Sequence, residues 1–160
     1  MPKRLADKNR KLNNELFNFL ENLLVFRTLE KRSVPSESGV KFHITRKVDE
    51  KALCFLVHID DQGNPIFDEG EKRPDYLAIY LSGAECICTI IEMKGKDGHR
   101  LSGGLKQIKN LEQRLKSEFR RCLPRNFQLH IQGLLLCPPN SQIPLDEIIQ
   151  RISRLPIMAI

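Results

Sequence analysis

The segment from Cys86 to Lys94 constrains the fold of this chain most strongly. It reads Cys-Ile-Cys-Thr-Ile-Ile-Glu-Met-Lys, so apolar residues occupy both sets of alternating positions until its last three residues. Because successive side chains of a strand point to opposite faces, a strand with this pattern is buried on both sides. Burial on both sides requires a sheet with structure packed on each face. The segment therefore predicts the central strand of an α/β domain.

Helical periodicity and turn residues predict the other elements. Leucines and phenylalanines in the first 31 residues recur on one side at helical spacing, and Pro124 ends a second apolar stripe of this kind. The predicted order is a helix over 5–31, a weak strand over 40–48, strands over 52–59, 75–81 and 86–94, a helix over 102–122, a strand over 127–136 and a helix over 141–152. The stretches 32–39, 60–65 and 66–72 have the composition of loops and turns. These elements predict one domain over residues 1–160, with a short mixed sheet flanked by helices. Its apolar end, Pro156 to Ile160, either packs onto the domain or is the cut edge of a longer protein.

Composition is that of a globular protein. The 160 residues are 41% hydrophobic, which is enough to bury a core. No apolar run reaches the ~18–20 residues of a membrane span, and no apolar signal core follows the basic N-terminus, which predicts a cytoplasmic protein with no membrane partner. The five cysteines are odd in number and lie mostly in apolar segments, which predicts buried thiols rather than disulfides. The net charge of +6 is compatible with a polyanionic partner.

Three charged residues lie where the predicted strands begin and end. Glu92 and Lys94 are two residues apart, so in a strand they share one face, while Ile91 and Met93 point into a core on the other. Asp75 begins the preceding strand, and a hairpin through the turn at 82–85 would bring it beside the other two. Two adjacent carboxylates repel each other, and a divalent cation relieves this. Oxygen ligands of this kind suit Mg²⁺ or Mn²⁺.

This combination of groups matches the needs of phosphodiester hydrolysis. That reaction requires an activated water, in-line attack and neutralisation of charge at the phosphate. A metal ion held by Asp75 and Glu92 can supply these requirements. Lys94 can orient or deprotonate the water and stabilise the developing charge.

The spacing of these residues resembles that of the PD-(D/E)XK nuclease superfamily. The resemblance rests on Pro74-Asp75, on Glu92-x-Lys94 followed by Gly95, and on a following helix that carries Gln107, and it covers about residues 10–137. It implies the αβββαβ core of the restriction-endonuclease-like fold. It also implies a metal-dependent enzyme that hydrolyses phosphodiester bonds, and we expect a DNA endonuclease.

The resemblance implies further site residues on two helices. Family members often carry a glutamine that faces the site, and Gln107 at the edge of its helix's apolar stripe is the candidate. They often add an acidic residue from the first helix. Glu15 borders the apolar stripe there, whereas Glu21 falls on the opposite side, so Glu15 is the predicted residue.

Basic residues flank the predicted site and are candidates for contacts with phosphates. They are Arg73, Lys96, Arg100, Lys106, Lys109, Arg114, Arg120 and Arg121, of which Arg73, Lys96, Arg100, Arg114 and Arg121 are the predicted nucleic-acid contacts. His99 follows Lys94 in a loop and could touch substrate, whereas His58 lies in a strand and is expected to be structural. The acidic residues at 68, 69 and 71 could lend a metal ligand.

Two other interpretations stay open at this point. The chain could be a nucleic-acid-binding or assembly module with the same fold and weak or no cleavage. It could also be an unrelated α/β domain, in which Glu92 and Lys94 form a surface ion pair far from Asp75. Within the nucleases, RNA is an alternative to DNA, and the small size is compatible with a homodimer or with a subunit of a larger complex.

Overall fold

Nearly continuous apolar runs build the two central strands, β4 (Tyr76–Ser82) and β5 (Glu85–Met93). They pair antiparallel, and Ser82 lies opposite Glu85 across the turn. Gly83 in this turn has a φ of 58°, a backbone conformation that glycine adopts without steric cost. The predicted hairpin is thus confirmed, with strand ends that differ by one residue.

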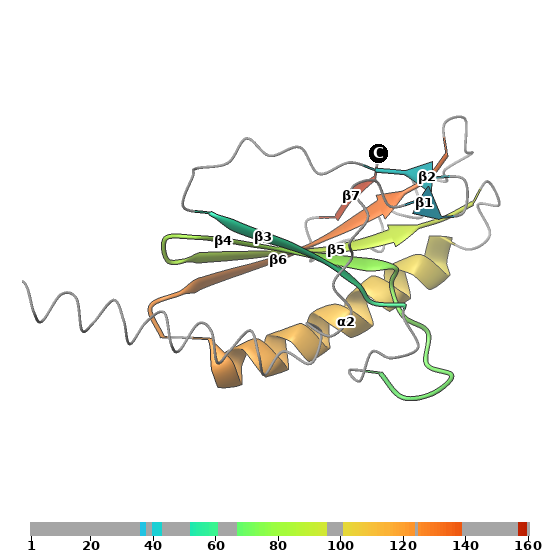
Figure 1. The fold of residues 1–160 in the computed structure, drawn as a ribbon. Helices are drawn as coiled ribbons and strands as arrows, with labels where there is room; N and C mark the ends of the chain where they lie inside the picture. The colour runs from blue at the N-terminus through green and yellow to red at the C-terminus, as the bar shows by residue number, and fades with distance from the viewer. Residues whose placement is uncertain are drawn as a thin grey trace, which may run out of the picture.

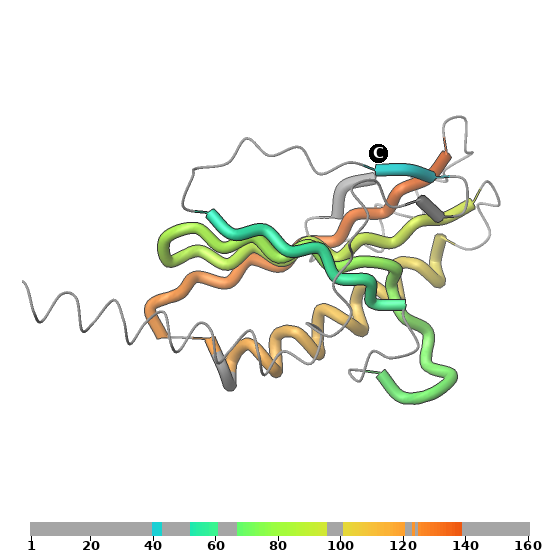
Figure 2. The backbone as a smooth tube through the Cα atoms, viewed as in Figure 1, coloured from blue at the N-terminus to red at the C-terminus, as the bar shows by residue number. Residues whose placement is uncertain are grey.

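The computed structural model describes residues 36–37, 40–42, 52–60, 67–95, 101–123, 125–138 and 157–159. In these residues a mixed five-stranded sheet has the order β3-β4-β5-β6-β7. β3 (Leu53–His58) pairs antiparallel with β4. β6 (Gln128–Leu136) pairs parallel with β5, and β7 (Ile157–Ala159) pairs parallel with β6. The helix α2 (Leu101–Cys122) connects β5 to β6 and runs along one face of the sheet (Figure 1; Figure 2). The α/β class, the mixed sheet and the order of strand and helix over residues 52–136 are confirmed.

Outside residues 52–136, two predictions differ from the structure, and the C-terminal segment follows one of its two alternatives by packing onto the domain. The stretch 32–39 was predicted as a loop, but β1 (Ser36–Glu37) pairs antiparallel with β2 (Val40–Lys41). Of the strand predicted over 40–48, only residues 40 and 41 are strand among those described. The apolar C-terminal segment joins the sheet as β7. The predicted helices over 5–31 and 141–152 lie outside the described residues, and none of the described helices is long and apolar enough to span a membrane.

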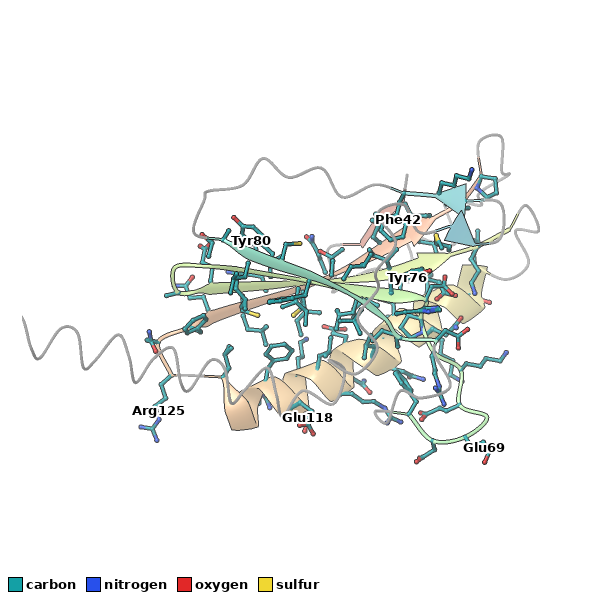
Figure 3. All side chains as sticks on the ribbon, viewed as in Figure 1. Phe42, Glu69, Tyr76, Tyr80, Glu118 and Arg125 are labelled. Carbon is teal, nitrogen blue, oxygen red and sulfur yellow. The ribbon has the colours of Figure 1, made fainter. Side chains whose placement is uncertain are left out.

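The two faces of the sheet bury different cores. The face beneath α2 holds the larger one, which includes Ile79, Ile90, Ile108, Leu111 and Phe119. On the opposite face a smaller cluster consists of Val40, Tyr76, Ile91, Met93 and Leu136. There the Tyr76 ring stacks on His58 at 4.8 Å between centroids and meets Phe42 edge-on at 5.5 Å (Figure 3). His58 is therefore part of the packing, as expected.

Candidate active site

Asp75 and Glu92 lie side by side where β4 begins and β5 ends. The register places Tyr76 opposite Ile91, so the residues just outside this pair are neighbours. The backbone N–H of Asp75 donates to Glu92 Oε2 at 3.2 Å, and the N–H of Met93 donates to Asp75 Oδ2. Each carboxylate therefore bonds the backbone of the other strand. This contact contradicts the interpretation in which Glu92 is far from Asp75.

Glu92 is buried more deeply than its place at a strand end suggested. Only 1% of it is exposed, because the first turn of α2 covers it on the helix side of the sheet. This burial raises the pKa of Glu92 to about 7, although the ammonium of Lys94 and the N–H of Asp75 oppose the shift. The negative charge of Asp60 raises that pKa further. Glu92 is therefore an acid that can exchange a proton near neutral pH.

Lys94 is held by two oxygen acceptors. Its ammonium forms an ion pair with Glu92 Oε1 and donates to Gln107 Oε1 at 3.1 Å. The amide nitrogen of Gln107 in turn donates to the carbonyl of Arg73, two residues before Asp75. A continuous network thus joins the Arg73 to Asp75 segment, α2 and β5. The structure brings Asp75, Glu92, Lys94 and Gln107 together, as the sequence predicted, and their roles stay predictions.

Substitution of Gln107 by alanine should weaken any activity that depends on Lys94. The change removes an acceptor from the ammonium and a donor from the Arg73 carbonyl, so we expect about 1–2 kcal/mol lower stability. Loss of a group that orients a site residue typically costs about 10- to 100-fold in rate. Thermal unfolding followed by circular dichroism would measure the loss of stability, and cleavage assays would measure the loss of rate. Gln113→Ala, an exposed glutamine on the same helix, is the matched control and should behave as wild type. Equal rates for the two variants would contradict a role for Gln107.

Two of the predicted phosphate contacts have partners within the protein. Arg114 forms an ion pair with Glu71, and its guanidinium lies 4.8 Å from the centre of the Phe67 ring. Arg73 lies 5.7 Å from the same ring and donates to the Asp68 carbonyl at 3.2 Å. These contacts fasten the loop before Asp75 to α2. Glu71 is engaged by Arg114 and by the Asp68 N–H, and the metal-ligand role of this acidic loop stays a prediction.

Five other predicted site residues belong to the part of the chain that is not described. Glu15, Lys96, His99, Arg100 and the side chain of Arg121 lie outside the described residues. Their roles stay as the sequence predicted them.

The sequence interpretation missed two residues near the site. Asp60 follows β3, and its N–H and that of Ile59 donate to the Asp75 carbonyl at 3.4 and 2.8 Å. An aspartate two residues after a strand that pairs with β4 is a signal that could have been used. Gly104 packs against Lys94 and Glu92, and nothing in its sequence context indicated this.

Asp75 and Glu92 are a donor set that would suit a magnesium ion whose other ligands are waters and substrate phosphates. Among the described residues, no group of three or more histidines, cysteines or acidic residues is arranged to hold a metal. Mg²⁺, however, is commonly bound through one or two carboxylates, with waters and substrate phosphates at the remaining positions. The adjacent carboxylates of Asp75 and Glu92 match that pattern.

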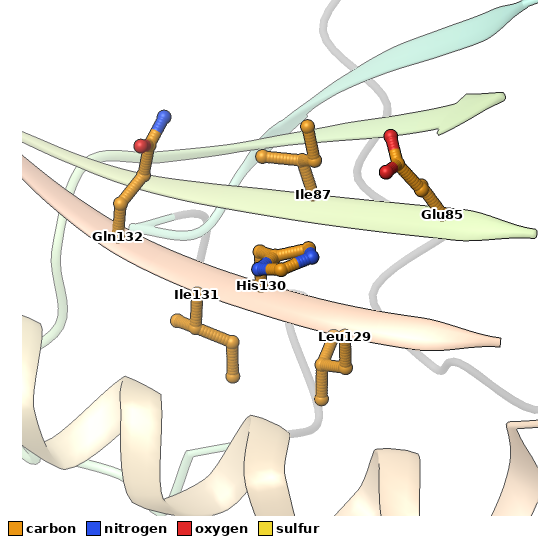
Figure 4. A pocket seen from close by; sticks show the side chains of 6 residues that line it. All are labelled: Glu85, Ile87, Leu129, His130, Ile131 and Gln132. Atoms are coloured by element: carbon orange, nitrogen blue, oxygen red, sulfur yellow. The ribbon is translucent and has the colours of Figure 1, made fainter.

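A hollow lies toward the other end of β5 and β6, away from Glu92 and Lys94. Its lining residues are Glu85, Ile87, Leu129, His130, Ile131 and Gln132 (Figure 4). Glu85 is seven residues before Glu92, which is roughly 20 Å along a strand. Among these described lining residues there is a single carboxylate, so the hollow does not repeat the donor pair of the first site.

Comparison with known proteins finds no relative from which a function could be transferred. The contacts of Asp75, Glu92, Lys94 and Gln107 are therefore the basis for inferring one. The chain matches no protein-family model, no curated protein and no solved structure.

Proposed function

We propose that this chain is a metal-dependent nuclease of the PD-(D/E)XK type that hydrolyses phosphodiester bonds in DNA. One observation carries the proposal: the Lys94 ammonium is held between the Glu92 carboxylate and the Gln107 amide, next to Asp75. The order of β3, β4, β5, α2 and β6 supports it, because it matches the βββαβ part of the restriction-endonuclease-like core.

The roles follow from the chemistry of each group. Asp75 and Glu92 would hold Mg²⁺ or Mn²⁺, which when bound supplies an activated water and charge neutralisation at the phosphate. Lys94 would donate a hydrogen bond to the attacking water or to a phosphate oxygen. Gln107 would keep the Lys94 ammonium directed into the site. Because these side chains hold one another in place before substrate arrives, little reorganisation is needed during reaction.

The outer side of α2 supports a polyanionic substrate. We call its exposed basic residues the α2 basic row; they are Lys106, Lys109, Lys116 and Arg120. They recur at helical spacing, so they lie along one side of the helix. A row of cations along the helix whose first turn covers Glu92 would contact phosphates without reading sequence, and binding would weaken as salt rises. Lys116 in this row also pairs with Glu112. DNA and RNA share this chemistry, and RNA is the alternative substrate.

A cleavage assay tests the proposed function. Supercoiled, linear, branched and single-stranded DNA, and matching RNA, would be incubated with Mg²⁺, Mn²⁺ or EDTA. We expect cleavage with either metal, none with EDTA, and none by Asp75→Asn purified in parallel. Cleavage that survives in Asp75→Asn would point to a contaminating nuclease. Absence of cleavage on every substrate would contradict the proposal.

A binding module without cleavage is the second candidate. It is favoured by the engagement of both Glu92 oxygens, one by Lys94 and one by the Asp75 N–H, in a residue only 1% exposed. A structural ion pair would look the same. Salt-dependent binding of nucleic acid that is indifferent to Mg²⁺, together with no cleavage, would identify this function.

A further inference from the structure

Gly104 brings the first turn of α2 against the stems of the two charged site residues. It is buried on the helix side of the sheet. A Cβ atom built at this position would lie 2.9 Å from Lys94 Cε, 3.1 Å from Glu92 Cγ and 3.1 Å from Leu135 Cδ1. Carbon atoms that pack well are separated by about 3.5–4.0 Å. The present positions of the two stems therefore depend on the missing side chain.

The contact is combined with a hydrogen bond from the same helix. Gln107 follows Gly104 by three residues, so both lie on one side of α2. Gly104 bounds the stem of Lys94, and Gln107 accepts from its ammonium at 3.1 Å. A displaced stem would carry the ammonium away from Glu92 and Gln107 together.

We propose that Gly104 is a positioning residue: its lack of a side chain places the Lys94 ammonium between Glu92 and Gln107. The position of the Lys94 ammonium is a property of the fold. The effect of that position on catalysis rests on the proposed function, so position and catalytic effect can be tested separately.

The neighbouring glycine provides a matched control. Gly103 lies in the same turn of α2, and a Cβ built there meets no atom within 4 Å. Alanine is favoured over glycine within helices, so on propensity alone both substitutions should stabilise the protein. Any difference between Gly103→Ala and Gly104→Ala therefore reports the contact with Lys94, Glu92 and Leu135.

Thermal unfolding tests the placement, with Gly103→Ala and Gly104→Ala each compared in the wild-type and in the Lys94→Ala background. Gly103→Ala should raise Tm by about 2–4 °C for a chain of this size. Gly104→Ala should show no such rise or a fall, because the Lys94 and Glu92 stems must shift to admit the new methyl group. In the Lys94→Ala background the contact with Lys94 Cε is gone. There Gly104→Ala should raise Tm by nearly as much as Gly103→Ala does in the same background. An equal rise for both glycines in the wild-type background, or a penalty that Lys94→Ala does not relieve, would overturn the proposal.

Cleavage kinetics test the consequence for catalysis. Misplacement of a reacting group by about 1 Å can cost about 100-fold in rate, so Gly104→Ala should lower kcat by about 10- to 100-fold. Its DNA affinity, measured with Ca²⁺ in place of Mg²⁺, should be unchanged, and Gly103→Ala should cleave as wild type. A wild-type kcat in Gly104→Ala would overturn the positioning role. If the chain cleaves no nucleic acid, the proposed function fails, while the unfolding measurements still decide the placement of Lys94.

Discussion

The Lys94→Ala protein is expected to lose about 100- to 1,000-fold of the cleavage rate, the cost of removing one preorganised electrostatic contact from a transition state. The ammonium is already held beside Glu92 and Gln107, so its charge is fixed in direction before substrate binds. Binding of DNA should fall far less, because the α2 basic row and other cations share the phosphate contacts. The effect should therefore appear in kcat rather than in affinity.

The structure changes what the same substitution should do to folding. A charged residue at the end of a strand is ordinarily semi-exposed, and its replacement by alanine then has little effect on stability. The Lys94 side chain is only 16% exposed, however, and its partner Glu92 is 1% exposed. Removing the ammonium leaves a buried carboxylate without its counter-charge, which is destabilising in proteins. Lys94→Met, which keeps most of the stem, should be the better-folded variant with the same loss of rate.

Two measurements check this expectation. Single-turnover cleavage with Mg²⁺ and DNA affinity with Ca²⁺ would be compared for wild type, Lys94→Ala and Lys94→Met, at temperatures where circular dichroism shows folded protein. Lys41→Ala removes the same charge from an exposed position on β2 and should behave as wild type. Unchanged cleavage in both Lys94 variants would remove Lys94 from the mechanism and with it the main support for a nuclease.

Glu92→Gln should make the metal-free protein more stable at alkaline pH. The pKa of Glu92 is raised from 4.5 to about 7, chiefly by burial. A folded-state pKa above the unfolded value means that the folded protein binds the proton more tightly. This contribution to stability is present below pH 4.5 and is lost as pH rises to about 7. Each pKa unit is 1.36 kcal/mol, so the loss amounts to about 3 kcal/mol. Glutamine resembles the protonated acid, so the Glu92→Gln protein should not lose this stability as pH rises.

Urea unfolding in EDTA at pH 4.5 and pH 8 would measure this difference. Wild type and Glu92→Gln should have similar stability at the lower pH, and the variant should be more stable at the higher one. Glu85→Gln, an exposed glutamate on the same strand, should follow wild type. Added Mg²⁺ at pH 8 should stabilise wild type and not Glu92→Gln, since an ion that binds only the folded protein raises its stability. Parallel pH profiles for wild type and Glu92→Gln would contradict a desolvated acid at this position.

The sequence by itself determined the local elements and the grouping of the charged residues. The apolar patterns of β4, β5 and β6 and the apolar stripe of α2 are local, and each element was located to within about one residue. A two-residue turn at Gly83 then leaves little choice of register, so Asp75 had to meet Glu92. Glu92 and Lys94 are two residues apart in extended backbone, so the local sequence also determined that they share one face of the sheet.

The tertiary structure alone decided how these residues are surrounded. β1 and β7 are two and three residues long, and such short strands depend on their partners rather than on their own sequence. The pairing of Arg114 with Glu71 joins residues 43 positions apart. In the sequence Glu92 resembles a solvent-facing residue at a strand end. It is buried because Gly104, which has no side chain, allows the first turn of α2 to pack closely against it. Burial and pKa depend on which distant backbone lies above a side chain, and no local pattern of residues records that.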